Sequence, residues 1–453
     1  MVAGREISAV ELVGHSLKRI EAVNGQINAF VAVDAERALG RASAIDRAVA
    51  AGQAVGPLAG VPIGVKDLED AAGFVTSHGS AAMCDREPAV ADSALVARLV
   101  AAGCVVVGKT NTPELGWVPE TINPLYGATL NPWDTSRSPG GSSGGSAAAI
   151  ASGMVPLATG SDGGGSIRIP ASVCGLSGFK PSLGRVVSAD SRPPDWPLLC
   201  TSSVMARKMA DTVTALGAAV GPDPRYLDSL PMPDSSWLDA LADPHVPLKV
   251  AWSPTLGYAP VDAEVRSVCE GALKVLEGLG AEIIEVETVF DEDPVASWLT
   301  LTAAYNLRTI EDRLGPGPWP GIDPALATMV EWAGTFSAVE VVRALDFCHR
   351  MNLRLVEVFH QARLLVTPTC AAIAPESGAP GMVNGVPEVD WVRFTYPFNM
   401  TRSPAASVCA GLSVERMPVG IQLVGPQHGD QVVLRAAAAL EAALGIDDLP
   451  PLE

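Results

Sequence analysis

The sequence predicts an α/β fold, with a large mixed β-sheet core flanked by helices on both faces. Short runs of Val and Ile without polar alternation recur along the chain, as in strands that are buried on both faces. Segments with apolar residues at helical spacing separate these runs. The chain has 453 residues, of which 48% are hydrophobic and 18% charged, so it can bury an extended core.

The predicted elements of the first half follow this alternation. Ser8 and Glu11 form a Ser-x-x-Glu capping box, which places the start of a helix at Ser8. A buried strand is predicted over residues 61–65 and carries Lys66 at its end. Further along, the pattern predicts a helix over 93–102, a β-branched strand over 104–107 and an Ala-rich helix over 143–152.

The second half continues the pattern with strands over 248–252 and 283–286 and a helix over 263–279. Pro and Gly cluster at 181–235 and 314–322, which predicts long loops or lids. Residues 290–363 contain four Trp and Tyr side chains and are expected to form helices outside the alternating core. Such helices would serve either as substrate-specific walls or as an ordinary cap.

We expect one domain over residues 1–453. Its signature core would cover about 55–190, a variable substrate-cap region about 190–390, and the C-terminal part of the core 390–453.

Charge and composition narrow the possible partners and location. The formal net charge is −19 and the pI is near 4.7, so nucleic acid and anionic membrane surfaces are disfavoured. Arg5 and Glu6 precede any apolar run, and no apolar stretch reaches transmembrane length, so a cytoplasmic location is expected. The eight cysteines are scattered without a Cys-x-x-Cys pair. We therefore expect neither a metal site nor a cofactor.

Two serines and a lysine carry the predicted chemistry. Ser142 lies in SPGGSSGG (138–145), and Ser166 lies in GSDGGGSIRIP (160–170). A serine hydroxyl needs a base before it can attack a carbonyl carbon. A lysine can be that base when burial lowers its pKa, and Lys66 follows an apolar strand. These are the parts of a serine hydrolase that uses no histidine.

Three glycines, Gly163, Gly164 and Gly165, directly precede Ser166. Without side chains, consecutive N–H groups can turn toward one point and bind a developing oxyanion. A glycine-rich turn with no catalytic role is the simpler alternative, and the nearby Ser142 and Lys66 favour the oxyanion hole.

Three other motifs are poorer candidates for a functional site. Residues 103–110 fit the Walker A pattern, but their Cys-Val-Val-Val middle is typical of a strand. Residues 140–144 fit a G-x-S-x-G elbow, yet no strand precedes them. Of the six histidines only His78 lies near a motif, and we interpret it as a loop residue.

The chain resembles the amidase signature family over almost its whole length, most weakly at about 190–390. The motifs that carry the resemblance are LAGVPIGVKD (58–67), GKTNTPELG (108–116), NPLYG (123–127), NPWD (131–134), GGSSGG (140–145), GGGSIRIP (163–170), FTYPFNMT (394–401) and MPVGIQLVG (417–425).

The resemblance implies a role for each matching residue. Ser166 matches the nucleophile, Ser142 the bridging serine that follows a cis peptide bond, and Lys66 the base. The N–H groups of Gly163, Gly164, Gly165 and Ser166 match the oxyanion hole. Ser143 is expected to hydrogen-bond near Lys66, and Asp162 with Arg168 to brace the nucleophile loop.

The implied reaction is hydrolysis of a C–N bond in a neutral aryl or acyl amide through a covalent acyl-Ser166 intermediate. Carbamate hydrolysis, releasing amine, CO2 and alcohol, is the alternative, and some esterase activity would accompany either. A glutaminase-type subunit of a tRNA amidotransferase is less favoured, because such members usually carry Gln where this chain has Ile169. Ser161 stands where the family more often has Thr, a change that keeps the hydroxyl. A catalytically dead scaffold is disfavoured, because Lys66, Ser142 and Ser166 are all present.

For the substrate pocket, Trp117 is a candidate wall because it follows a signature stretch, with a packed core tryptophan as the alternative. Gly141 is expected as a neighbour of the substrate. We expect the chain to act as a monomer or homodimer.

Overall fold

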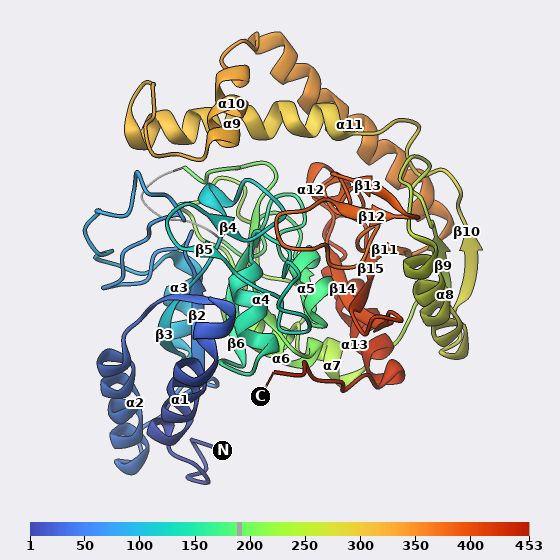
Figure 1. The fold of residues 1–453 in the computed structure, drawn as a ribbon. Coiled ribbons are helices and arrows are strands. Elements are labelled where there is room, and N and C mark those ends of the chain that lie inside the picture. The colour runs from blue at the N-terminus through green and yellow to red at the C-terminus, as the bar shows by residue number, and fades with distance from the viewer. Residues whose placement is uncertain (188–192, 453) are drawn as a thin grey trace.

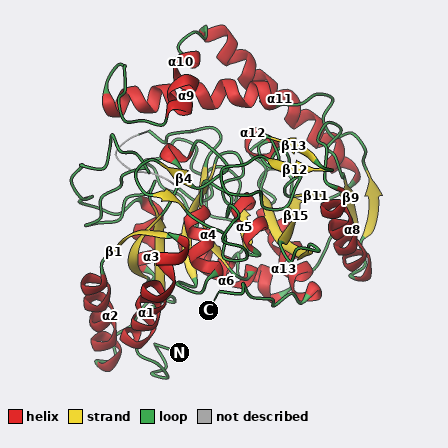
Figure 2. Cartoon of the chain, viewed as in Figure 1, coloured by secondary structure: helices red, strands yellow, loops and turns green. Residues whose placement is uncertain are grey.

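A computed structural model describes residues 1–187 and 193–452. It confirms the predicted α/β class: eleven strands form one mixed sheet in the order β1-β3-β2-β6-β8-β7-β14-β15-β11-β9-β10. Most strands lie in the interior with helices around them, and the edge strand β10 lies at the right periphery (Figures 1 and 2). Two small two-stranded sheets, β4-β5 and β12-β13, lie outside the large one.

The strands of the structure have the following bounds: β1 (Phe30–Val33), β2 (Pro62–Lys66), β3 (Val105–Thr110), β4 (Ile122–Asn123), β5 (Gly127–Ala128), β6 (Leu157–Asp162), β7 (Ser177–Lys180), β8 (Thr201–Ala206), β9 (Lys249–Trp252), β10 (Glu282–Glu285), β11 (Leu364–Pro368), β12 (Gly381–Val383), β13 (Val386–Glu388), β14 (Ala405–Leu412) and β15 (Pro418–Val424).

The helices have the following bounds: α1 (Ala9–Ile27), α2 (Ala35–Ala50), α3 (Ala94–Ala101), α4 (Gly144–Ala151), α5 (Arg168–Cys174), α6 (Met209–Ala219), α7 (Asp239–Ala242), α8 (Ala263–Gly278), α9 (Val295–Leu314), α10 (Pro324–Ala333), α11 (Ala338–Gln361), α12 (Pro397–Met400) and α13 (Asp430–Leu444), with a short 3-10 helix at Glu114–Gly116.

Most predicted elements are present within one or two residues of their expected bounds. The capping box is confirmed, since Ser8 Oγ accepts from the Glu11 N–H and the Glu11 carboxylate accepts from the Ser8 N–H. The Walker-like segment 103–110 contributes the core strand β3, so the strand interpretation is confirmed. Helices α9, α10 and α11 occupy the segment that was expected to form helices outside the core.

The expectation of a long loop over 181–235 is wrong in part, and residues 188–192 within it lie outside the described part. Strand β8 lies between β6 and β7 in the centre of the sheet, and helix α6 follows it. All six residues of β8, read TSSVMA, are buried. A short strand with three hydroxyl side chains lacks both the apolar run and the alternation by which strands are predicted. Its burial depends on neighbouring strands that are distant in sequence.

Strand pairing brings the first half of the chain into a parallel unit. β2 pairs in parallel with β3 and with β6, whereas β8 runs antiparallel to β6. All five residues of β2 are buried, as its apolar sequence predicts. The carboxyl ends of β2 and β6 therefore meet at one edge of the sheet, which sets the position of the residues that end them, Lys66 and Asp162.

Two sets of helices flank the sheet. α4 and α5 contact each other and pack on central strands, whereas α3, α6, α13 and α8 form a second row of neighbouring helices. α9, α10 and α11 cross the molecule at the top of Figure 1, and we call these three helices the cap. The cap meets the 83–117 region through a separate apolar cluster: Met83, Leu115, Ile310, Ile322, Leu326 and Val330.

Two features of the described residues bear on membranes and metals. No single helix there has the length and apolar character to cross a membrane. Helices α10 and α11 together have a sufficient length and apolar composition, but they are bent by 101° relative to each other. In the same residues, no group of three or more His, Cys, Asp or Glu side chains is placed to hold a metal ion.

Candidate active site

Lys66 lies at the centre of a group of serine hydroxyls. Its side chain is fully buried at the end of β2, and Nζ is 2.7 Å from Ser142 Oγ and 2.9 Å from Ser143 Oγ. Ser161, in β6, is the third partner, with Oγ at 3.0 Å. Both Ser142 and Ser143 lie just before α4, so the structure brings together residues from β2, β6 and the loop before α4.

Burial alters the proton affinity of this lysine. Desolvation lowers the pKa of Lys66 from its usual value near 10.5 to about 8, although Cys200, Glu69 and Asp162 act to raise it. A substantial fraction of the amine is therefore neutral near neutral to mildly alkaline pH. A neutral amine has a lone pair and can accept a proton, which an ammonium cannot do.

The loop that carries Ser142 is tied to the loop that carries Ser166. The peptide bond between Gly141 and Ser142 is cis, as the resemblance implies. The Ser143 N–H donates to the carbonyl oxygen of Ser166 at 3.2 Å. This bond joins the two serine loops directly, although 24 residues separate Ser142 from Ser166.

Asp162 and Arg168 brace the loop of Ser166 from within. Arg168 Nη2 lies 2.8 Å from Asp162 Oδ1, and both side chains are fully buried. Asp162 also accepts from the N–H groups of Gly165 and Ile167, on either side of Ser166. Burial acts to raise the pKa of Asp162, but the charge and hydrogen bonds of Arg168 outweigh it and leave the pKa at about 2.

Arg168 extends this brace into the C-terminal motifs. Nη1 donates to the Thr395 carbonyl oxygen at 2.8 Å and to Gln422 Oε1 at 2.7 Å, and Nη2 donates to Asn399 Oδ1 at 2.6 Å. These partners come from FTYPFNMT and MPVGIQLVG. The resemblance motifs that are far apart in sequence therefore meet in one buried network around the arginine.

The glycine run lies beneath two tryptophans. A Cβ on Gly163 would come within 2.5 Å of Trp196 Cε3, and one on Gly164 within 2.6 Å of Trp298 Cζ2. Gly165 has φ = +126°, a conformation that side chains other than glycine rarely adopt. These positions require glycine because of packing and backbone geometry.

The four N–H groups expected to form an oxyanion hole differ in their bonding. The Gly165 N–H already donates to Asp162 Oδ1 at 2.8 Å. The N–H groups of Gly163, Gly164 and Ser166 make no hydrogen bond with the described residues. Three of the four expected donors are therefore unengaged next to the Ser166 side chain.

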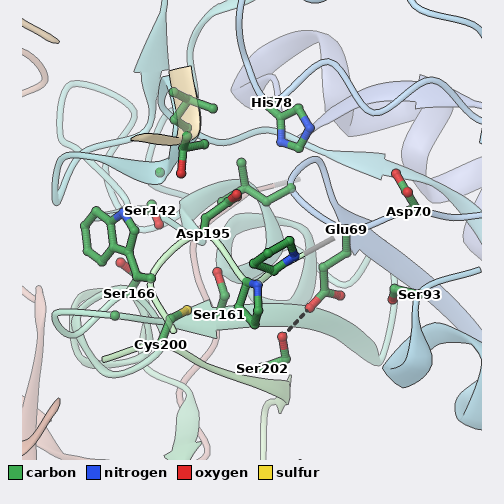
Figure 3. A pocket seen from close by; sticks show the side chains of 18 of the residues that line it. Glu69, Asp70, His78, Ser93, Ser142, Ser161, Ser166, Asp195, Cys200 and Ser202 are labelled. Carbon is green, nitrogen blue, oxygen red and sulfur yellow. Dashed lines mark hydrogen bonds between the residues drawn. The ribbon is translucent and has the colours of Figure 1, made fainter. Parts of the chain in front are cut away.

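The serines open into a cavity of about 360 Å³, a size that suits a small ligand. Ser142, Ser161 and Ser166 lie together on one side of it, and Glu69 lies across from them and accepts a hydrogen bond from Ser202 (Figure 3). Ser166 is partly exposed and lines the cavity. Burial raises the pKa of Glu69.

The cavity walls differ from the expected ones. Trp117 and Gly141 do not lie among the described residues that line it. Trp117 packs in the apolar cluster under the cap, and Gly141 faces the Glu120 backbone, where a Cβ would come within 2.6 Å. The position of Trp117 agrees with the alternative of a packed core tryptophan. Leu115 and Gly116 do line the cavity.

Several lining residues carried no sequence signal. Trp196, Glu69 and Ser202 line the cavity, as do Thr309 and Arg313 of α9. They belong to segments distant in sequence, and no spacing pattern connects them. His78 is on a loop, as expected, but it is buried and also lines the cavity.

Comparison with known proteins decides the family. The model of the Amidase family matches residues 11–434. The chain belongs to the amidase family. An acylamidase of Rhodococcus erythropolis is 36% identical, with 100% of this chain and 95% of that protein covered. A glutamyl-tRNA(Gln) amidotransferase protein of Chloroflexus aggregans is 34% identical over 97% of this chain and 94% of that protein.

Solved structures of related hydrolases have the same fold. A bacterial aryl acylamidase of the amidase signature family superposes with a TM-score of 0.91 at 29% identity, covering 98% of this chain and 94% of that one. 6-Aminohexanoate cyclic dimer hydrolase, complexed with its substrate, also gives 0.91 at 29% identity, covering 100% and 97%. Family membership supports amide C–N hydrolysis as the activity of this amidase.

Proposed function

We propose that the protein hydrolyses the C–N bond of neutral aryl or acyl amides through a covalent acyl-Ser166 intermediate. The observation that carries the proposal is the buried Lys66 amine, whose Nζ lies 2.7 Å from Ser142 Oγ. The loop that contains Ser142 is hydrogen-bonded to the backbone of Ser166 through the Ser143 N–H. The acylamidase and aryl acylamidase to which the chain is similar support the amide class.

The proposed first half-reaction is a proton relay. Neutral Lys66 accepts the Ser142 proton while Ser142 accepts the proton of Ser166, whose oxygen attacks the carbonyl carbon. The free N–H groups of Gly163, Gly164 and Ser166 would stabilise the oxyanion. As the C–N bond breaks, the relay returns a proton to the departing nitrogen, because an amine anion is a very poor leaving group.

The second half-reaction releases the acyl group. Water gives up a proton to the same relay and attacks the ester carbonyl of acyl-Ser166. The C–O bond to Ser166 breaks, the serine oxygen regains a proton, and the carboxylic acid leaves. No metal or cofactor takes part in the proposed steps.

The test is release of one aromatic amine from a matched pair, its acyl amide and its ethyl carbamate, with Ser166→Ala as the blank. We expect faster release from the amide, loss of release in the variant with its thermal unfolding unchanged, and an acyl adduct on Ser166 in intact-protein mass spectra. Faster carbamate cleavage would make urethane hydrolysis the function. Cleavage of glutamine alone would instead indicate the tRNA-linked class.

A further inference from the structure

Two residues of the cap helix α9 line the cavity and carry buried hydrogen-bonding atoms that have no partner among the described residues. Thr309 and Arg313 both line it, on the helix that crosses above the sheet (Figure 1). Thr309 is 2% exposed, and the Arg313 side chain is 8% exposed. Thr309 Oγ1 and Arg313 Nη1 are buried, and neither has a hydrogen-bond partner among the residues that the structure describes. Buried donors are normally paired, so this pair points to a missing acceptor.

The two side chains lie on one face of α9. Residues four apart on a helix are neighbours, and Asn306, three residues before Thr309, shares that face. Asn306 Oδ1 accepts from Trp196 Nε1 at 3.0 Å, and Trp196 packs on Gly163 of the proposed oxyanion loop. This face of α9 is therefore fixed against the same cavity that contains Ser166.

The position of Arg313 is also fixed, and its charge is compensated. Nη2 donates to both carboxylate oxygens of Asp195, at 2.7 and 2.8 Å. The neighbouring Arg308 donates to the carbonyl oxygens of Pro194 and Asp195 and lies 3.6 Å from Asp312. Because each arginine has a carboxylate partner, the unpaired Nη1 offers hydrogen bonds without a net charge to attract an anion.

We propose that Thr309 and Arg313 form a specificity subsite for a second, neutral carbonyl group in the substrate. Arginine has donors and no acceptor, so a group that satisfies Nη1 must be an acceptor, and the Thr309 hydroxyl can donate to the same oxygen. The inference rests on the proposed function and narrows its substrates to amides with another amide, ester or keto oxygen away from the scissile bond.

The test uses acyl anilides of equal length in which a carbonyl replaces one methylene at successive positions. A second arm carries the extra carbonyl on the aniline ring and so distinguishes an acyl-side from an amine-side subsite. At least one carbonyl-bearing substrate should exceed its hydrocarbon counterpart in kcat/KM by about tenfold or more, since a site built for hydrogen bonding discriminates strongly.

The variants distinguish loss of the subsite from a general loss of stability or activity. Thr309→Val should remove most of that preference and Thr309→Ser should retain it. Arg313→Lys, which keeps a charge for Asp195 but lacks Nη1, should also reduce it. The control is Thr300→Val, in the same helix, whose hydroxyl donates to the Ala296 carbonyl oxygen; it should leave the preference unchanged.

A binding measurement keeps the inference separate from the chemistry. In Ser166→Ala, calorimetric Kd values for the same ligand pairs should show tighter binding of a carbonyl-bearing member, and adding Thr309→Val should abolish the difference. Equal Kd values at every carbonyl position would overturn the subsite. Failure of wild type to cleave any anilide, with the difference in Kd intact, would overturn only the proposed function.

Discussion

Lys66 Nζ lies 2.7 Å from Ser142 Oγ, and Lys66 has no carboxylate within salt-bridge distance among the described residues. Another buried lysine, Lys109, lies 3.4 Å from Asp67 Oδ1. Burial lowers the pKa of both lysines, but the adjacent Asp67 carboxylate acts to raise that of Lys109. The two lysines therefore differ in their neighbours, which are serine hydroxyls for Lys66 and a carboxylate for Lys109.

Replacing Lys66 should remove nearly all turnover. Lys66→Ala deletes the proposed base, and we expect kcat for anilide release to fall by about 10²-fold or more. Lys66→Arg is the informative partner, because arginine keeps a cation and donors but does not deprotonate in proteins. It should be as inactive as the alanine variant. Substantial turnover by either variant at neutral pH would rule out the relay.

The rate should depend on pH through Lys66. The base acts when neutral, so kcat/KM should rise as pH increases through about 8, the pKa to which burial lowers this amine. Glu69 acts to raise that pKa. In Glu69→Gln this effect is absent, and the rising limb should therefore move to lower pH. Rate assays across pH 6–10 would measure the rising limb of the wild type and that of Glu69→Gln.

The exposed Glu277→Gln in α8 serves as the matched control for charge removal. Its pH profile should coincide with that of the wild type. A Glu69→Gln limb that stays in place or moves to higher pH would contradict the assigned electrostatic coupling.

A methyl group on Gly164 should disturb both packing and catalysis. Its Cβ would meet Trp298 Cζ2 at 2.6 Å, so Gly164→Ala should lower the free energy of unfolding by about 1–3 kcal/mol through overpacking. Movement of the loop would also displace the N–H donors and lower kcat. Chemical denaturation and anilide kinetics would measure the two effects.

Gly271 in α8 provides the comparison, because nothing lies within 4 Å of a Cβ placed there. Gly271→Ala should leave kcat unchanged and stabilise the helix by up to about 1 kcal/mol. An equal response of the two glycines would show that the tryptophan contact does not constrain the loop.

Removing Arg168 should destabilise the protein strongly. Arg168→Ala leaves the Asp162 carboxylate buried without its cation, a change that typically costs about 3–5 kcal/mol. Urea unfolding monitored by circular dichroism would measure the loss. Arg266→Ala, which removes an exposed cation paired with Glu270 at 2.7 Å within α8, should cost less than about 1 kcal/mol. Similar losses for the two variants would show that the buried brace contributes little.

The sequence alone determined the fold class and the first-half elements, and its motifs pointed to Lys66, Ser142 and Ser143, which lie together in the structure. Those predictions succeeded where the signal is local: a capping box at Ser8, an apolar strand over 61–65, and motifs in which each glycine or serine has a fixed neighbour. The grouping of Lys66, Ser142 and Ser166 was predicted from the family resemblance, because members of a family share the spatial arrangement of their motifs.

Tertiary structure decided what no local pattern contains. Strand β8 is buried because β6 and β7 pair with it, although its sequence is polar. Trp196 lines the cavity, whereas Trp117 packs against the apolar cluster under the cap. Thr309 and Arg313 became candidates for a subsite only because the structure shows Thr309 Oγ1 and Arg313 Nη1 buried without partners among the described residues. Burial and unmet hydrogen bonds are properties of the packed chain, so the sequence could not show them.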